Sequence, residues 1–183
     1  MNPLRCSVSE NYFKLFELTQ GFAIDAPALE VRWRQMAAQV HPDRFATASP
    51  SERRVAMQWA STINEGYRVL KHPLLRARYL CEQAGCDLQT ESNTQMDGDF
   101  LMRQMSWREA LDDARESGDA ADFKRLAADI AQARTDMETT VANLIDQQHD
   151  FKAAAGKVRE WMFIDKLDAE VRNALHEAAD RQN

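Results

Sequence analysis

Pro42 constrains the fold of this 183-residue chain strongly, because it stands between two segments with helical periodicity. Proline cannot continue a helix, and it pushes the residue before it toward extended conformations. We therefore expect one helix to end near Val40 and a loop to span residues 41–48. The next helix should begin at Ser49-Pro50-Ser51-Glu52, a capping-box pattern with proline at the first helical position. A short loop between two such helices predicts an antiparallel hairpin.

Helical periodicity also dominates the rest of the chain, and almost no segment has the alternation of a strand. We expect further helices over residues 10–18, 26–40 and 74–84, and then three longer ones over 99–116, 120–144 and 151–179. Residues 86–98 are polar, contain turn formers and lack a period, which indicates a domain boundary. The predicted fold is all-α. An N-terminal domain over residues 9–84, a helical hairpin plus a short helix, precedes a three-helix bundle over residues 85–183.

Apolar stripes along the predicted helices indicate which side chains form the core. The first helix should bury Tyr12, Leu15 and Phe16, and the second should present a stripe from Leu29 to Val40. In the third helix either Val55 or Ala56 can begin the stripe. The remaining expected core positions are Trp59, Ile63 and Leu70 in the third helix, Phe123, Leu126, Ile130, Met137, Val141 and Leu144 in the sixth, and Val158, Met162, Leu167, Val171, Leu175 and Ala178 in the last.

Charge is distributed unevenly along the chain. The net charge is −6, but residues 1–78 carry 11 Lys/Arg against 7 Asp/Glu and residues 79–183 carry 12 against 22. This asymmetry predicts that the two halves have different partners. No basic stripe interleaved with aromatic residues supports nucleic-acid binding, and no polybasic surface or long apolar run supports membrane binding. Without a signal-peptide pattern, and with an odd number of cysteines, the protein is expected in the reducing cytoplasm.

Residues that could support catalysis or metal binding are few. Cys81 and Cys86 have C-x4-C spacing, but Cys6 is remote, so we expect buried structural thiols rather than a cluster site. His72, His149 and His176 have no partner at metal-ligand spacing. We therefore predict no cofactor, no metal site and no enzymatic activity.

The motifs together resemble a known family. The placement of His41-Pro42-Asp43 between two helices is similar to the J domain of DnaJ-type co-chaperones. The segments NYFKLFEL, STINEGYRVLKHPLLRARYL, DFLMRQMSWREAL and EWMFIDKL are similar to HscB, the J-protein family of bacterial iron-sulfur cluster assembly. The resemblance extends from about residue 11 to about residue 175.

This resemblance implies that one surface docks on a chaperone. In J domains the His-Pro-Asp loop and the preceding helix bind a DnaK-like ATPase and stimulate hydrolysis of ATP. The matching residues are His41, Pro42 and Asp43, with Arg32 and Arg34 as candidates for the basic docking face. The expected partner is an HscA-type chaperone. A structural alternative is that the triplet only ends a helix and forms a turn.

The resemblance also implies a second surface, which binds the scaffold protein IscU. The matching residues are Leu101, Met102, Met105, Glu109 and Phe163. A stripe of Met and Leu at helical spacing is more often core, so their exposure is the open question. The family often has a glutamate at the position of Ser106, and human relatives carry an N-terminal cysteine zinc site that has no counterpart here.

Two other functions compete with this prediction. A general J-protein would bind many unfolded clients rather than one folded scaffold. A redox module would use a reactive thiol at Cys81 or Cys86.

Overall fold

The computed structural model describes residues 11–88 and 96–181, and over those ranges the chain forms helices and loops without a strand. The chain divides into two compact units, with the division between Leu80 and Cys81. The first unit contains α1 (Tyr12–Leu15), α2 (Ala26–Gln39), a 3-10 turn η2 (Pro42–Phe45) and α3 (Pro50–Lys71). Helix α4 (Pro73–Gln83) runs across the division. The all-α prediction is confirmed.

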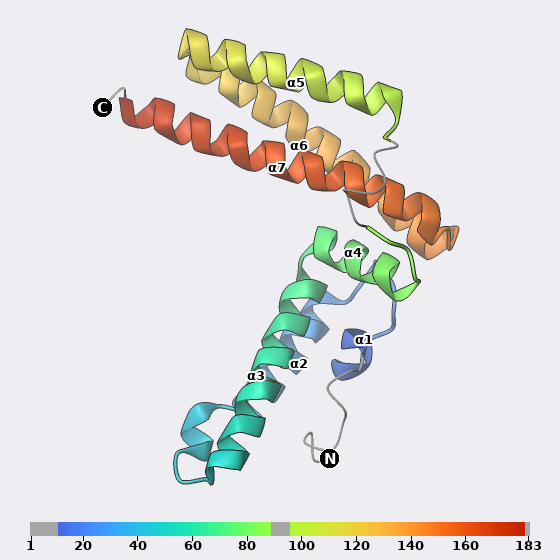
Figure 1. Ribbon diagram of the computed structural model, residues 1–183, viewed down its shortest axis with the longest axis vertical. Coiled ribbons are helices and arrows are strands. Elements are labelled where there is room, and N and C mark those ends of the chain that lie inside the picture. The colour runs from blue at the N-terminus through green and yellow to red at the C-terminus, as the bar shows by residue number, and fades with distance from the viewer. Residues whose placement is uncertain (1–10, 89–95, 182–183) are drawn as a thin grey trace. The chain divides into compact units, whose positions relative to one another are not determined.

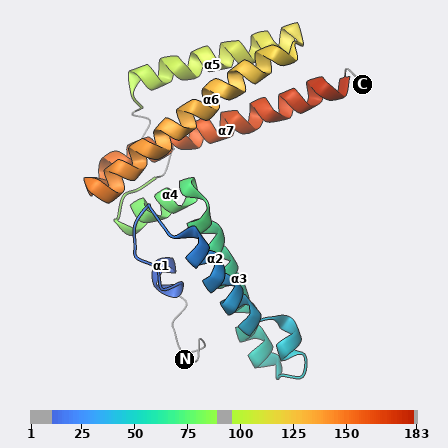
Figure 2. The same ribbon diagram turned by 180° about the vertical axis from the view of Figure 1, so that it is seen from behind.

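The α2–α3 hairpin forms as the sequence predicts. Asp25 caps α2 by accepting a hydrogen bond from the backbone of Ala28 at 2.9 Å, and the two helices pack side by side (Figures 1 and 2). Ser49 and Glu52 form the reciprocal hydrogen bonds of a capping box at the start of α3. Of the two alternatives for the α3 stripe, Ala56 is buried and Val55 is exposed.

The first helix is shorter than predicted. It ends at Leu15 because Glu17 adopts a positive φ of 52°, and its backbone N–H turns to the carbonyl of Lys14. Phe13 and Phe16 are buried, whereas Tyr12 and Leu15 are only half-buried, so the expected stripe was partly wrong. The predicted loop 41–48 also contains the 3-10 turn η2.

The buried side chain of Arg76 connects helix α4 to α3 and to the segment before α2 by hydrogen bonds. Arg76 donates to the carbonyl oxygens of Phe22 at 2.7 Å and Leu70 at 2.5 Å, and its guanidinium lies over the Phe22 ring. Tyr79 stacks on Tyr12 at 4.8 Å between ring centroids, and its hydroxyl oxygen accepts a hydrogen bond from the Tyr12 backbone N–H at 3.0 Å. These contacts keep α1, α3 and α4 together around the hairpin.

The second unit contains three long helices that lie alongside one another (Figure 1). They are α5 (Gly98–Ser117), α6 (Ala120–Ala142), extended by a π-helical turn η3 (Asn143–Gln147), and α7 (Phe151–Arg181). The π turn replaces the continuous α-helix predicted to residue 144. The core of this unit includes Trp107, Leu111, Phe123, Ile130, Trp161 and Ile164. The predicted α7 stripe omitted Trp161 and Ile164, while Met162 is only half-buried.

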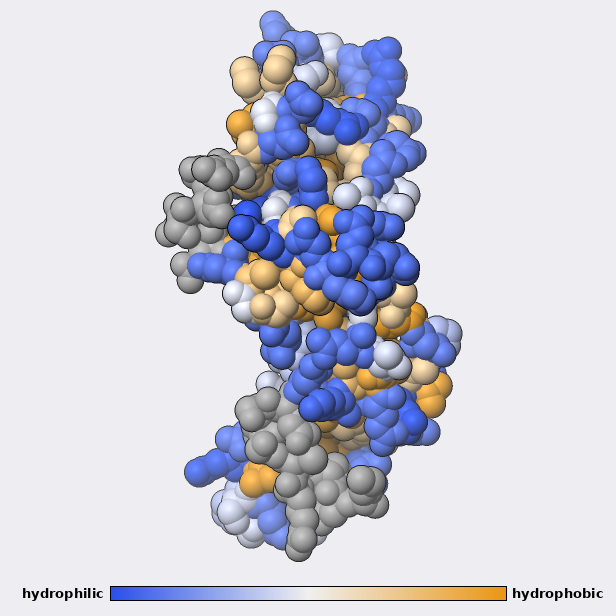
Figure 3. Space-filling view, turned by 90° about the vertical axis from the view of Figure 1, so that its right-hand side faces the viewer, coloured by the Kyte–Doolittle hydropathy of each residue, from blue (hydrophilic) through white to orange (hydrophobic). Residues whose placement is uncertain are grey.

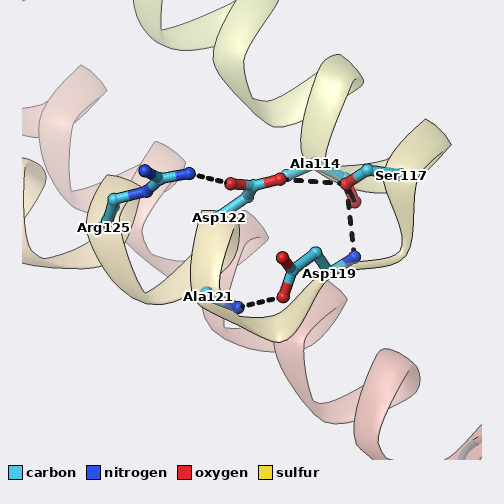
Figure 4. Close-up of polar contacts among 6 residues, drawn as sticks. All are labelled: Ala114, Ser117, Asp119, Ala121, Asp122 and Arg125. Carbon is cyan, nitrogen blue, oxygen red and sulfur yellow. Dashed lines mark hydrogen bonds and ion pairs between the residues drawn. The ribbon is translucent and has the colours of Figure 1, made fainter.

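A tight polar turn joins α5 to α6 (Figure 4). Gly118 takes a left-handed conformation with φ 67°, which glycine adopts without steric cost, and ends α5. Asp119 caps α6 by accepting from the backbone of Ala121 at 2.8 Å. The Arg125 guanidinium, and then the Ser117 hydroxyl, lower the pKa of Asp122. This turn fixes α5 against α6.

Candidate binding surfaces

The His41-Pro42-Asp43 loop lies at the exposed end of the α2–α3 hairpin. His41 has the extended backbone expected before a proline, with ψ 134°, and its ring Nδ1 accepts from the backbone N–H of Asp43 at 3.4 Å. The side chain of Asp43 is 90% exposed, and its Oδ2 lies 3.5 Å from the same imidazole nitrogen. Within the described ranges no lysine or arginine pairs with Asp43, so its carboxylate is available to a cation on another molecule.

The two arginines predicted to flank this loop both have carboxylate partners. Arg32 pairs with Glu17 at 2.7 Å, and Arg34 pairs with Glu30 one turn earlier on α2. Both are solvent-exposed, and such pairs contribute little to stability. The pairing does partly neutralise the basic face that the sequence suggested on α2.

The apolar residues predicted on α5 are exposed. Leu101 is 44%, Met102 72% and Met105 65% exposed, and Phe163 on α7 is 38% exposed. These four residues are among the most exposed large apolar side chains described. The core interpretation is therefore wrong for Leu101, Met102 and Met105, while Phe163 is partly covered. Exposed apolar residues at this spacing are typical of a surface that binds another protein.

Part of this set lines one groove between α5 and α7. Met105, Glu109 and Phe163 share a depression of about 370 Å³ with Lys166, which sequence reasoning did not include. Lys166 is three residues after Phe163 and is exposed, so helical spacing alone could have indicated it. Leu101 and Met102 lie outside the groove lining. Ser106 lines a different depression, between α5 and α6, together with Asp113, Asp122 and Asp129.

The two cysteines in the described ranges, Cys81 and Cys86, are not joined by a disulfide. Cys81 is buried, and burial raises the pKa of its thiol to about 12. Cys86 is half-buried and has no disulfide partner, and Cys6 lies outside the described residues. A high pKa keeps the nucleophilic thiolate scarce at neutral pH. Over residues 11–88 and 96–181 no group of three or more His, Cys, Asp or Glu is arranged to hold a metal ion.

No helix in the described ranges is long and apolar enough to cross a membrane. In the space-filling view, hydrophilic residues cover most of the visible face, with apolar patches between them (Figure 3). The fold and its exposed residues therefore define a helical protein with two candidate protein-binding surfaces, one on each unit.

Comparison with known proteins agrees with this class. A family model described as the HSCB C-terminal oligomerisation domain matches residues 96–172. The co-chaperone HscB homolog of Bordetella petrii is 61% identical over 166 residues, which cover 91% of this chain and 96% of that protein. The homolog of Azoarcus sp. strain BH72 is 44% identical over 168 residues, covering 92% and 95%. The chain belongs to the HscB family of co-chaperones.

Solved structures show the same fold. Chaperone HscB from Vibrio cholerae superposes with a TM-score of 0.81 at 33% identity, covering 92% of this chain and 99% of that one. The human co-chaperone protein HscB gives a TM-score of 0.85 at 23% identity, covering 91% and 83%, and at that identity it supports the fold alone.

Proposed function

We propose that this protein stimulates the ATPase of an HscA-type, DnaK-like chaperone and delivers an IscU-type scaffold protein to it in the cytoplasm, without catalysing a reaction itself. The observation that carries the proposal is the exposed Asp43 carboxylate at the tip of the hairpin, without a lysine or arginine partner in the described chain. In a member of the HscB family, this is the group best placed to meet a cation of the chaperone.

The first unit is proposed to act as a J domain, with a docking loop of His41, Pro42 and Asp43. Pro42 fixes the backbone of the short turn, and the hydrogen bond from the Asp43 N–H to the His41 ring holds the backbone at Asp43, whose carboxylate is exposed. On docking, the carboxylate would lose water and gain a cation. Removing one partner of such a pair at an interface costs about 2–5 kcal/mol. Arg32 and Arg34 are proposed to add electrostatic attraction from α2.

The second unit is proposed to hold the scaffold on an apolar face, made of Leu101, Met102, Met105 and Phe163 with Glu109 at its polar edge. Methionine side chains are flexible and polarizable, which suits a surface that must adapt to a partner. Because each partner binds a different unit, one molecule brings chaperone and scaffold to high effective concentration.

Steady-state ATP hydrolysis tests the chaperone half of this proposal. A purified HscA-type chaperone should hydrolyse ATP faster when the wild-type protein is added, and Asp43→Asn should abolish the stimulation. Circular dichroism of Asp43→Asn should match the wild type, because the side chain is exposed and supports no core contact. Equal stimulation by wild type and Asp43→Asn would contradict the proposal.

Binding to the scaffold tests the other half. Leu101→Ala with Met105→Ala should weaken binding of a folded IscU-type protein, measured by calorimetry, at least tenfold through loss of buried apolar area. A different result would favour a general J-protein: no binding of the scaffold, together with equal binding of reduced, unfolded model clients by the wild type and the variant.

A further inference from the structure

The positively charged side chains of the first unit differ in whether they have a carboxylate partner. Arg32 pairs with Glu17 in the segment between α1 and α2, Arg34 pairs with Glu30 on α2, and Arg68 pairs with Glu65 near the end of α3. Arg53 and Arg54, in the first turns of α3, are exposed, and no carboxylate of the described ranges pairs with them. Arg53 and Arg54 are therefore two adjacent exposed cations without a carboxylate partner in the described ranges, at the start of α3.

Glu52, the acidic residue next to Arg53 in the sequence, forms hydrogen bonds with Ser49. The Glu52 carboxylate accepts from the backbone N–H of Ser49 at 2.9 Å and from its hydroxyl at 2.7 Å, which closes the capping box. These hydrogen bonds lower the pKa of Glu52 and hold the carboxylate at the cap. Glu52 is thus directed to the helix end and forms no ion pair with Arg53 or Arg54.

An exposed apolar side chain lies beside the two arginines. Arg53, Arg54 and Met57 line a shallow depression with Pro50, Gln58 and Ser61, all at helical spacing on one face of α3. Met57 is 69% exposed. The opposite face of the helix carries the buried residues Ala56, Trp59 and Ile63. The basic and apolar face of α3 therefore has no contact role in the core of its own unit.

This face begins at the same end of the hairpin as the docking loop. The turn η2 (Pro42–Phe45) packs against α3, and α3 begins five residues after η2 ends. Arg44, the residue after Asp43, is also exposed and has no ion-pair partner among the described residues. A partner that reaches Asp43 would meet these guanidinium groups at the same end of the hairpin.

We propose that the chaperone docking surface extends from the loop onto this face of α3, and that Arg53 and Arg54 bind an acidic, partly apolar patch on the chaperone ATPase, with Met57 covering its apolar part. The proposal rests on the proposed function, since it names a further contact of the same docking event. We name an acidic patch as the partner surface because guanidinium groups bind carboxylates in bidentate geometry. Exposed charges at the rim of an interface also accelerate association.

The experiment measures ATPase stimulation as a function of the concentration of this protein, at low and at high salt. Arg53→Gln/Arg54→Gln should raise the half-maximal concentration by roughly three- to tenfold at low salt and leave the maximal rate unchanged, because the Asp43 loop is intact. At 0.5 M salt the difference should shrink, since exposed charges are screened. Met57→Ser should raise the half-maximal concentration by a smaller factor that persists at high salt.

Arg68→Gln/Lys71→Gln is the matched control, because it removes the same charge from the same helix several turns away from the loop. It should leave the half-maximal concentration unchanged. Wild-type behaviour of Arg53→Gln/Arg54→Gln at low salt, or an equal effect of the control, would overturn the α3 surface while leaving the proposed function standing. Absence of stimulation by the wild type would overturn both. Thermal unfolding of each variant establishes that the comparison is between folded proteins.

Discussion

At the residue scale, Gly66 shows why a helix interior can require glycine. It lies inside α3, in the second-last turn, where glycine is intrinsically unfavourable by about 1 kcal/mol relative to alanine. A Cβ there would come within 2.9 Å of Cδ1 of Tyr12 and 3.1 Å of Cε2 of Phe16. Both rings are held in place, since Phe16 is fully buried and Tyr12 stacks on Tyr79. Close packing of α1 on α3 therefore outweighs helix propensity at this position.

Gly66→Ala should destabilise the protein, with the overpacking cost of about 1–3 kcal/mol exceeding the gain in helix propensity. Gly156→Ala in α7 is the matched control, because its nearest neighbour is the end of the Arg159 side chain at 3.9 Å. That change should stabilise by about 0.5–1 kcal/mol. Urea unfolding measures both effects. Stabilisation by both substitutions would contradict the prediction, because it would show that the Tyr12 and Phe16 rings move aside for a Cβ at little cost.

The buried Cys81 thiol should resist alkylation in the folded protein. Because burial raises its pKa to about 12, the thiolate is scarce at pH 8, whereas half-buried Cys86 should react with iodoacetamide first. Mass spectrometry after peptide digestion measures both sites, and labelling in urea supplies the fully accessible control. Native labelling of Cys81 as fast as Cys86 would instead favour the redox-module alternative.

At the element scale, the sequence predicts ends of helices better than contacts between them. The capping box at Ser49 and the break at Pro42 are local, and their physical causes lie within four residues of sequence, so both are visible without a structure. The pairing of Arg32 with Glu17 and the packing of Trp33 on Tyr67 depend on how helices are placed in space. The sequence therefore named Arg32 and Arg34 as candidates for the basic docking face without showing that Arg32 has a partner outside its own helix.

The exposure of the candidate scaffold surface likewise could not be predicted from the sequence, because it depends on contacts between helices. Helical spacing placed Leu101 and Met105 on one face of α5, but a stripe of this kind predicts burial as readily as exposure. Only the packing of α5 on α6 and α7 decides that Trp107 and Leu111 face the core and that Met105 faces solvent. The groove that joins Met105 to Lys166 is lined by residues of α5 and α7, which α6 separates in the sequence, so local spacing could indicate Lys166 beside Phe163 but not that both lie beside Met105.

The capping box of α3 should depend on pH. Ser49→Ala removes the hydroxyl that caps the helix and should lower the thermal midpoint by about 5 °C at pH 7. The Ser49 hydroxyl and backbone N–H lower the pKa of Glu52, so the stabilisation from this carboxylate is present above pH 4.5 and is lost as the pH falls further. The effect of Ser49→Ala should therefore be smaller at pH 3.

Ser51→Ala is the control for this prediction, because within the described part of the chain its hydroxyl bonds to the Ser49 hydroxyl, at 3.0 Å, and to no backbone N–H. Circular dichroism melts at the two pH values measure the effect. A loss on Ser49→Ala that is equal at pH 3 and pH 7 would show that the hydroxyl, rather than the Glu52 carboxylate, supplies all of the capping.

At the scale of the whole molecule, charge and exposure separate the two candidate surfaces. Residues 1–78 carry an excess of four positive charges and residues 79–183 an excess of ten negative charges. The exposed loop and its arginines belong to the first unit, and the exposed Met and Leu side chains of α5 belong to the second. Substitutions on one surface should therefore leave binding at the other intact, since sites that share no partner residues act additively.

The measurement that tests the central claim most directly is ATP hydrolysis by an HscA-type chaperone with an IscU-type scaffold present or absent, for the wild type and two variants. The wild type should stimulate hydrolysis alone, and more strongly with the scaffold. Leu101→Ala/Met105→Ala should keep the first effect and lose the second, whereas Asp43→Asn should lose both. Stimulation of the wild type that is indifferent to the scaffold, or loss of basal stimulation in the Leu101/Met105 variant, would contradict two separate binding surfaces.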